Sequence, residues 1–134
     1  EWREYDSGGN MIHSKDSVGF ELWYEYDSNG KLVHFKNSDG HEEWKEYDSE
    51  GNLLHTKGFS GIRFEEWYEY DSKGNLLHYK DSRGSEEWYE YDSDGNEIHV
   101  KNSNGYEEWG EYDNNGNLVH LKELPGTEWT ITIE

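Results

Sequence analysis

The stretch Glu42–Lys57, EEWKEYDSEGNLLHTK, decides the fold, because the chain repeats it about every 21 residues. A tyrosine follows each of the first six tryptophans by three residues, and a histidine and a lysine lie eight and ten residues beyond it. Turn residues separate two short β-favouring segments, 43–48 and 52–57, and no apolar run has helical spacing. This pattern predicts tandem β-hairpins. The repeated tryptophans are Trp2, Trp23, Trp44, Trp67, Trp88, Trp109 and Trp129.

Two kinds of turn alternate along the chain. The segment 49–51 fits a three-residue type I loop with glycine in the left-handed position, which sets Asp48 opposite Asn52. Asp39-Gly40 fits a two-residue type I′ loop, which sets Ser38 opposite His41. Together the two loops predict a register that repeats every 21 residues, with equivalent side chains on the same face and at the same height.

This register predicts that tryptophan and histidine point to opposite faces of the sheet. On one face Trp44 lies between Phe35 and Thr56, and on the other Lys45 lies between two histidines. Tyrosine–leucine and glutamate–lysine pairs occupy the rest of the second face. Cross-strand pairs of these kinds stabilise a sheet by about 0.2–1 kcal/mol each.

The composition is unusual for a globular domain. Only 31% of the residues are apolar and the net charge is −19, whereas a globular domain has roughly 45–50% apolar residues. Such values alone favour disorder, but 16% aromatic residues and the strict repeat favour a folded sheet. The charge disfavours nucleic acid and anionic membranes as partners and favours a cationic one. The chain lacks cysteine and any apolar stretch of membrane-span length.

We therefore expect an all-β fold, a tandem array of β-hairpins forming an open, twisted antiparallel meander sheet of about 13 strands, which could coil into a spiral. A closed barrel or a small propeller is the alternative. We treat residues 1–134 as a single array. Its repeats are 1–20, 21–41, 42–64, 65–85, 86–106 and 107–126, followed by a terminal strand, 127–134. The chain starts within a repeat, which suggests a piece of a longer polypeptide.

The run Y-D-S-x-G-N-L resembles the YD repeat of RHS-type proteins. It occurs with small substitutions at 26–32, 47–53, 70–76 and 112–118, and a second glycine (Gly40, Gly84, Gly105) fits the same pattern. The resemblance covers nearly the whole chain. It implies spiralling antiparallel sheet built into large secreted or surface-associated bacterial proteins and toxin-encapsulating shells, here without the toxin domain.

Asp-rich turns and regularly placed histidines invite metal-site interpretations. The turn at 92–96 has calcium-ligand residue types, but glutamate and serine occupy the places where an EF-hand needs glycine and glutamate. Turn chemistry explains these residues better. Successive histidines would lie about 9.6 Å apart, two strands away. We expect no metal site and no cofactor, and interpret the histidines as cross-strand partners, with a pH-responsive surface as an alternative.

The tryptophan row is the strongest binding candidate. Aromatic rings flanked by carboxylates could stack on sugars or cations, although the favoured interpretation is that each ring merely covers its cross-strand neighbour. A glycosidase would need one carboxylate pair in a cleft, not six equivalent glutamates on an open sheet, so we expect no catalytic residues. The candidate ligand-binding residues are Trp23, Trp44, Trp67, Trp88, Trp109, Glu46, Glu69 and Glu90.

These patterns predict a non-enzymatic structural or interaction module, and the resemblance implies that it belongs to a larger bacterial secreted or cell-surface protein. The alternative is a carbohydrate- or cation-binding module that uses the tryptophan face, and a remote one is a glycoside hydrolase that uses the glutamate row. The expected partners are a glycan or a cationic protein surface. Exposed sheet edges could also pair with other chains.

Overall fold

The computed structural model describes residues 1–124, and it describes the backbone alone for 127–130. The terminal strand expected at 127–134 therefore lies partly outside the described residues. Every regular element in the described part is a β-strand, and none is a helix. The described residues thus include no helix that is long and apolar enough to span a membrane.

The strands follow the repeat closely, with the tryptophan-bearing strands alternating with the histidine-bearing ones. They are β1 (Trp2–Tyr5), β2 (Met11–Lys15), β3 (Glu21–Tyr26), β4 (Leu32–Asn37), β5 (Glu42–Tyr47), β6 (Leu53–Phe59), β7 (Arg63–Tyr70), β8 (Leu76–Asp81), β9 (Glu86–Tyr91), β10 (Glu97–Asn102), β11 (Glu107–Tyr112), β12 (Leu118–Leu124) and β13 (Thr127–Thr130).

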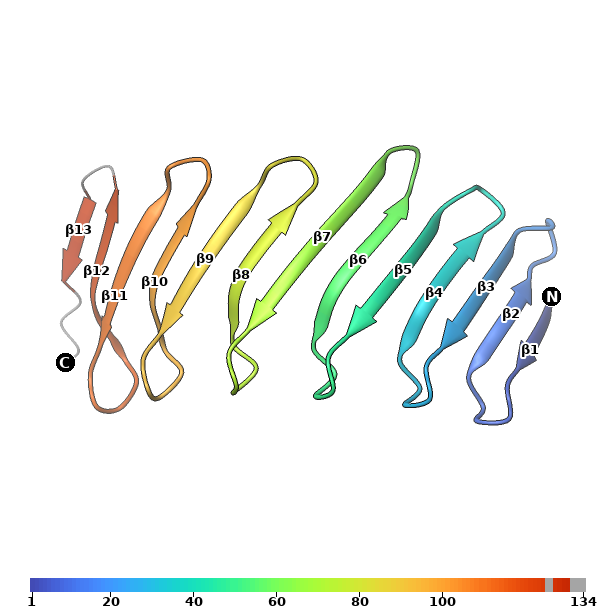
Figure 1. Cartoon of the computed structure of the whole chain (residues 1–134), viewed down its shortest axis with the longest axis horizontal. Coiled ribbons are helices and arrows are strands. Elements are labelled where there is room, and N and C mark those ends of the chain that lie inside the picture. Colours follow the sequence, from blue (N-terminus) through green and yellow to red (C-terminus); the bar gives the residue numbers. More distant parts are fainter. Residues whose placement is uncertain (125–126, 131–134) are drawn as a thin grey trace. The chain divides into compact units, whose positions relative to one another are not determined.

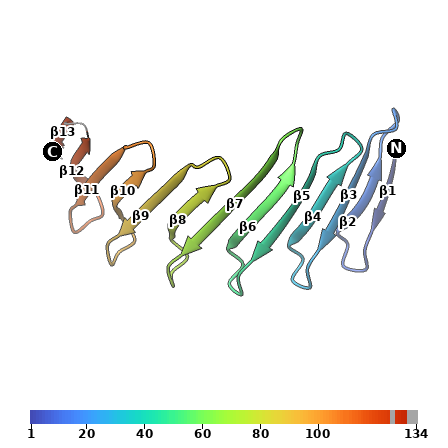
Figure 2. The same cartoon turned by 45° about the horizontal axis from the view of Figure 1, so that its top comes forward.

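The sheet order runs from β1 to β13 in sequence, so the fold is an open antiparallel meander of hairpins, as predicted. The chain divides into two compact units, 1–66 and 67–134. In the first unit β1 to β6 lie side by side in chain order, and in the second unit β8 to β12 do the same (Figures 1 and 2).

The D-S-x-G-N turns have the predicted three-residue geometry. Gly51 donates to the carbonyl of Asp48 at 3.1 Å, Asp48 donates back to the carbonyl of Asn52 at 3.0 Å, and Gly51 has φ +91°. The Asp48 carboxylate also accepts the Asn52 backbone N–H at 2.7 Å and the Asn52 side-chain amide at 2.8 Å. Aspartate, glycine and asparagine are therefore all used by the turn itself.

The prediction of a two-residue type I′ turn at Asp39-Gly40 is wrong. Asn37 donates to the carbonyl of His41 at 2.9 Å and Gly40 donates to that of Asn37 at 3.1 Å, which closes a loop of three residues. A type I′ turn would need Asp39 at positive φ, but only glycines have positive φ in the described chain. The Asn37 side chain accepts the backbone N–H groups of residues 39 and 41 at 3.0 Å each. These bonds stabilise the longer loop.

A β-bulge changes the register within the D-S-x-G-N hairpins. Tyr47 pairs with Leu53 as predicted, but a shift follows between Glu46 and Tyr47, and Glu46 then pairs with His55. The bulge pairs Trp44 with Lys57, while the three-residue loop before β5 pairs it with His34 on the other side, so its two partners are 23 positions apart. With two three-residue loops alone, equivalent residues of successive repeats would alternate between the two faces. The one extra residue of the bulge returns them to the same face. They advance two residues along the strand per repeat and do not stay at the same height.

The predicted distribution of side chains between the faces is therefore wrong. Tryptophan and histidine share one face, which we call the Trp face, because His34 pairs directly with Trp44. Lys45 pairs with Thr56, and Phe35 pairs with Tyr24 and Glu43, on the opposite Tyr face. The shift of one residue moved the histidines away from the Lys45 position and brought them beside the tryptophans.

The two-residue insertion lengthens the β6–β7 hairpin. Its turn has a backbone bond of 3.1 Å from Ser60 to Ile62 and a left-handed Gly61. Phe64 packs over Gly58, where a Cβ atom would lie 2.4 Å from the carbonyl oxygen of Glu42 and 2.8 Å from the Phe64 ring. Glycine is required at position 58 because the strand leaves no room for a side chain.

The described residues have no conventional core. No apolar side chain among them is fully buried, and Thr56, at 3% exposure, is the buried residue. Its hydroxyl donates to Glu43 at 3.1 Å, and Lys45 bridges the same carboxylate at 3.0 Å. Stability therefore depends on neighbour contacts within the sheet, which each hairpin repeats.

Candidate functional site on the Trp face

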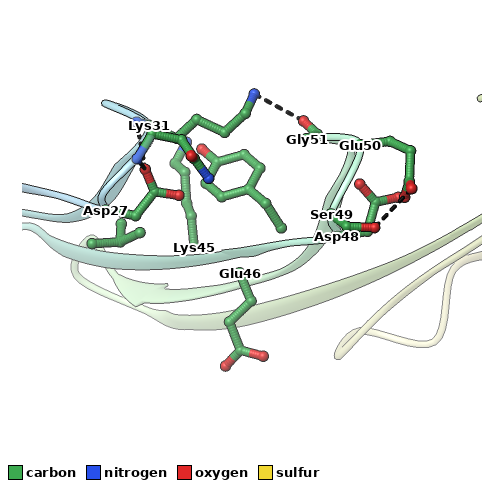
Figure 3. Close-up of a pocket in the computed structure, with 11 residues that line it drawn as sticks. Asp27, Lys31, Lys45, Glu46, Asp48, Ser49, Glu50 and Gly51 are labelled. Carbon is green, nitrogen blue, oxygen red and sulfur yellow. Dashed lines mark hydrogen bonds between the residues drawn. The ribbon is translucent and has the colours of Figure 1, made fainter.

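The pleat determines which residues reach the Trp face. In a tryptophan-bearing strand such as β5, Glu42, Trp44 and Glu46 alternate with residues of the Tyr face. In Figure 3, Glu46 points to the opposite side of the sheet from Lys45 and Lys31. Five tryptophans therefore have a carboxylate two residues before them and another two residues after them on the same face: Trp23, Trp44, Trp67, Trp88 and Trp109.

Histidine rings stack on the tryptophans of the following strand. The ring centroids of His34 and Trp44 are 4.9 Å apart and the planes are within 10° of parallel. His99 and Trp109 lie 5.0 Å apart at 8°. The stack recurs in His13–Trp23 and His78–Trp88, at 4.9 and 5.4 Å. One face of each of these indoles is thus covered by the protein itself.

Lysines approach tryptophans from the strand that follows. The ammonium groups of Lys36, Lys80, Lys101 and Lys122 lie 4.9 to 5.5 Å from the ring centroids of Trp23, Trp67, Trp88 and Trp109. This is within the range of a cation–π interaction. Trp88 and Trp109 therefore each have an imidazole on one side and an ammonium group on the other.

The histidines also contact carboxylates, and His34, His55, His78 and His99 contact two each. The first is on the following strand, and its distance to Nε2 is 2.8 to 2.9 Å for His13, His34, His55, His78 and His99. The second is on the preceding strand, and its distance to Nδ1 is 3.2 to 3.7 Å for His34, His55, His78, His99 and His120.

The imidazoles of His34 and His99 each lie between two carboxylates, with both contacts at 3.2 Å or less, so each ring joins the strands on its two sides. In the β2–β3 hairpin, Lys15 and His13 both bond to Glu21, and these bonds lower the pKa of that carboxyl.

The sequence-selected residues lie together on this face but differ in exposure. The tryptophans Trp23, Trp67, Trp88 and Trp109 are half-buried, and Trp44 is 38% exposed. The side chains of Glu46, Glu69 and Glu90 are 67 to 74% exposed. Carboxylates are therefore the most accessible groups of the candidate site. The histidines that cover the indoles were missed because the loop at 38–40 was predicted one residue too short, and the lysines because the bulge could not be read from the pattern.

The described residues contain no group of three or more histidine, aspartate or glutamate side chains arranged to hold a metal ion. The turn aspartates instead accept bonds from their own loops. Asp92 binds the N–H groups of Asp94 and Asn96, both at 2.9 Å, and the Asn96 amide at 2.8 Å. The bond from the Asn96 amide is the largest cause that lowers the pKa of Asp92.

The Tyr face is held by aromatic pairs and tyrosine hydroxyl bonds. Tyr24 and Phe35 lie 5.3 Å apart, and the hydroxyl of Tyr47 donates to the carbonyl of Leu32 at 3.0 Å. The hydroxyl of Tyr106 donates to Glu108, which raises the pKa of Tyr106 to about 12. The phenols of this face are therefore used as hydrogen-bond donors.

A shallow groove of about 670 Å³ lies between two neighbouring turns of the first unit. Lys31 crosses it, 5.1 Å from the Tyr47 ring centroid, and donates to the carbonyl of Gly51 at 3.0 Å (Figure 3). Lys31 takes the place that asparagine has in the turns at 48–52 and 92–96. It links two turns and fills part of the groove.

The comparison with protein families agrees with this geometry. Residues 1–129 match the Teneurin YD-shell family. The chain belongs to this family. None of the curated proteins matches the chain.

The chain is similar in fold to a small part of several much longer chains in solved structures. A crystal structure of TcdB2-TccC3-Cdc42 matches with a TM-score of 0.72 and 16% identity, over 90% of this chain and 7% of that one. A crystal structure of TcdB2-TccC3-TEV gives 0.73 and 15%, with the same coverage. The Tc holotoxin pore of Photorhabdus luminescens gives 0.67 and 18%, over 81% and 6%. At these identities the similarity shows the fold.

Proposed function

We propose that this YD-shell chain is a non-enzymatic structural segment, a stretch of sheet wall, within a larger secreted or cell-surface protein. The observation that supports this most is the Trp–His–Glu ladder, which recurs in both units with nearly constant distances. Its aromatic faces and imidazole nitrogens are occupied by neighbouring strands. The side chains that could do chemistry are therefore used to join one hairpin to the next.

The family match over residues 1–129 supports the same role, because the family is described as a shell. The chain spans 6 to 7% of the matched structures, which fits one segment of a larger protein. The glutamate row offers little to catalysis, because Glu46, Glu69 and Glu90 have similar exposure and each lies beside a histidine in the same way. Equivalent carboxyls lack the difference in environment that separates an acid from a base.

Duplication of one repeat tests this proposal. A chain carrying a second copy of residues 86–106 should fold with the same circular dichroism per residue, and its free energy of unfolding should be equal or higher, because each repeat mainly contacts its neighbours. A matched control duplicates 86–105, one residue less, which disturbs the register. The proposal fails if both insertions unfold the chain or if both are tolerated equally.

A second candidate is a surface that binds cationic ligands, and the exposure of the glutamate row favours it. Carboxylates 67 to 74% exposed beside Trp44-type rings would attract a lysine-rich chain. The covered indole faces make sugar stacking the weaker form of this candidate.

Titration calorimetry with oligolysine and cell-wall glycans distinguishes these forms. The cationic form predicts oligolysine binding that Glu46→Gln, Glu69→Gln and Glu90→Gln together weaken. Glu86→Gln is the control, because that carboxylate is bonded to His78 at 2.8 Å. If no ligand binds, or if the control weakens binding as much as the triple variant, the candidate is lost.

A further inference from the structure

One tryptophan in the interior of the sheet is less covered than its counterparts. Trp44, on β5, is 38% exposed. Its half-buried counterparts are Trp23, Trp67, Trp88 and Trp109. Each of these four has the ammonium group of a lysine on the next strand 4.9 to 5.5 Å from its ring centroid.

Trp44 lacks this lysine contact although the lysine is present in the sequence. Lys57 pairs with Trp44 at the corresponding place. Lys57 is exposed, however, and its ammonium group makes no cation–π contact, ion pair or hydrogen bond within the described part of the chain. His34 stacks on one face of the Trp44 indole, and the exposure of the ring leaves the other face accessible.

The two-residue insertion brings a second aromatic ring to this indole. In three other hairpins the residue two positions after the lysine is a turn serine: Ser38, Ser82 and Ser103. Here β6 continues, and Phe59 pairs with Glu42 on the Trp face. Phe59 is therefore a diagonal neighbour of Trp44, at a spacing of about 7–8 Å that an aromatic side chain can reach across. Phe59 is 43% exposed, so both rings border the same accessible surface.

Carboxylates lie beside the two rings on the same face. Glu42 and Glu46 precede and follow Trp44 by two residues, and their side chains are 39% and 67% exposed. Glu42 bonds to His34 through Oε1 at 2.9 Å, and its Oε2 has no side-chain partner among the described residues. All of these residues belong to the first unit. The patch thus combines an accessible indole face with accessible negative charge.

An ammonium group has the chemistry that this patch recognises. A cation over an exposed indole face is stabilised by about 0.5–1 kcal/mol, and ammonium N–H groups donate to carboxylate oxygens. The four lysines that cover the other tryptophans show that an indole of this face accepts a primary ammonium group. An anionic ligand would be repelled by the two carboxylates.

We propose that Glu42, Trp44, Glu46 and Phe59 form a binding site for a primary alkylammonium group, the chemistry shared by a lysine side chain and a free polyamine. The ammonium group lies over the accessible face of Trp44 and donates to a carboxylate, and its methylene chain packs against Phe59. The site goes beyond the role of a sheet wall. It rests on the cationic surface considered above only through Glu46, because the insertion confines it to one repeat.

A titration of the full, isotope-labelled chain followed by nuclear magnetic resonance tests the proposal. The probes are Nα-acetyl-lysine methylamide and spermidine, each added at constant ionic strength so that screening stays the same. We expect saturable shifts of the Trp44 indole N–H, and smaller, unsaturated shifts at Trp88 and Trp109, which carry their own lysines. Saturable binding of either probe at Trp44 supports the site, and the lower Kd identifies the source of the ammonium group.

Two variants of the β6–β7 hairpin locate the site. Phe59→Ser introduces the residue that other hairpins carry at this place, and it should weaken binding at Trp44 roughly two- to fivefold, which corresponds to a contact of cation–π size. Ile62→Ala is the matched control, since Ile62 is 68% exposed in the same hairpin, and it should leave the affinity unchanged.

Two lysine variants test the part played by the protein's own ammonium groups. Lys101→Ala uncovers one face of Trp88 and should make that indole respond to the probes. Lys57→Gln removes the nearest competing cation, so its affinity at Trp44 should equal or exceed that of the wild type. Weaker binding by Lys57→Gln would contradict the proposal.

The site can fail independently of the glutamate row. The double variant Glu69→Gln and Glu90→Gln should leave the affinity at Trp44 unchanged. If oligolysine binds the chain while Trp44 shifts no more than Trp109, the cationic surface stands and this site is lost. The proposal is also overturned if Nε-acetylated lysine, which has no charge, shifts Trp44 equally, or if Phe59→Ser binds as tightly as the wild type.

Discussion

At the scale of single residues, the decisive contact is the stack of histidine on tryptophan between neighbouring strands. In the pair His99 and Trp109 the rings are nearly parallel, and the imidazole nitrogens reach Glu90 at 3.2 Å and Glu107 at 2.9 Å. An aromatic ring, an imidazole and two carboxylates thus form one cluster. None of these groups is fully buried, so each stabilises the sheet more through contacts with its neighbours than through removal from water.

A double-mutant cycle between His99→Ala and Trp109→Ala measures this contact. We expect a coupling of about 0.5–1.5 kcal/mol in the free energy of unfolding, the range of an aromatic pair. The control cycle joins His99→Ala with Tyr89→Ala, because Tyr89 pairs with Val100 on the other face. A larger coupling for His99 with Tyr89 than with Trp109 would support the register predicted from sequence and contradict the structure.

Glu97 is a charged residue at a position where the β5–β6 hairpin has leucine. It pairs with Tyr91 at the place where Leu53 pairs with Tyr47. Burial, and then the nearby Glu108, raise the pKa of Glu97. The folded state therefore favours the protonated form, and ionisation at neutral pH destabilises it.

Replacing Glu97 by leucine should stabilise the chain by roughly 0.5–2 kcal/mol at pH 7, as optimised positions often do. Glu97→Gln, which removes only the charge, should give a smaller gain. Both gains should shrink as the pH falls through the raised pKa of Glu97, because the wild-type carboxyl is then neutral as well. Thermal unfolding at neutral and acidic pH measures this, and a gain that grows on acidification would contradict the assignment.

At the scale of the hairpin, the two turns have the same design. An aspartate or asparagine accepts the N–H groups of the second and fourth residues after it, and a left-handed glycine stands at the third. Asp48-x-x-Gly51 and Asn37-x-x-Gly40 both show this spacing in the sequence. The signal for a three-residue loop was therefore present at Asn37, and the dipeptide Asp39-Gly40 obscured it.

The strands, the first turn and the open meander followed from the sequence because local turn chemistry and alternation specify them. The shared face of tryptophan and histidine did not, since it depends on a loop of three residues between Asn37 and His41 and on a bulge between Glu46 and Tyr47. The extra loop residue changed the partner of His34 from Lys45 to Trp44. The bulge, which is set by how two strands fit together and has no residue type of its own in this repeat, did the same for the next hairpin by pairing His55 with Glu46.

The turn aspartates make the hairpins sensitive to acid. Bonds from the paired asparagine lower the pKa of Asp48, Asp71 and Asp92 below the ordinary value of 3.8. The unfolded chain binds these protons more tightly, so the stabilisation is complete above about pH 4 and is lost as the pH falls through the lower folded values.

We expect the melting temperature to fall in this acidic range, and Asp92→Asn to weaken that dependence, because the amide keeps an acceptor that does not titrate. Thermal unfolding followed by circular dichroism between about pH 5 and 2 provides the comparison. An identical pH dependence for the variant and the wild type would exclude Asp92 as a contributor.

Two glycines test the backbone of the hairpins separately. Gly95 has φ +89° and open space around it, so Gly95→Ala should cost about 1–2 kcal/mol from the left-handed conformation alone. Gly95→Asn should cost less, because asparagine tolerates that conformation. Gly58→Ala should cost more than Gly95→Ala, since its Cβ would meet a backbone oxygen at 2.4 Å. Denaturant unfolding ranks the three variants, and a harmless Gly58→Ala would refute the packing at the insertion.

At the scale of the whole molecule, the chain is a series of equivalent hairpins whose contacts connect each strand to the next. The division into units 1–66 and 67–134 does not change the pattern, since the ladder has the same distances in both. A protein built in this way needs no closed core to fold. Its composition has too few apolar residues for an apolar interior, and rows of aromatic and charged side chains hold the strands together in its place.

The most direct test of this account is a measurement of the nuclear Overhauser contacts of the histidine rings. The structure predicts contacts from His34 to Trp44, from His78 to Trp88 and from His99 to Trp109, whose ring centroids are 4.9 to 5.4 Å apart. Contacts from the histidine rings to the side chains of Lys45 and Tyr89, without contacts to the tryptophans, would contradict it.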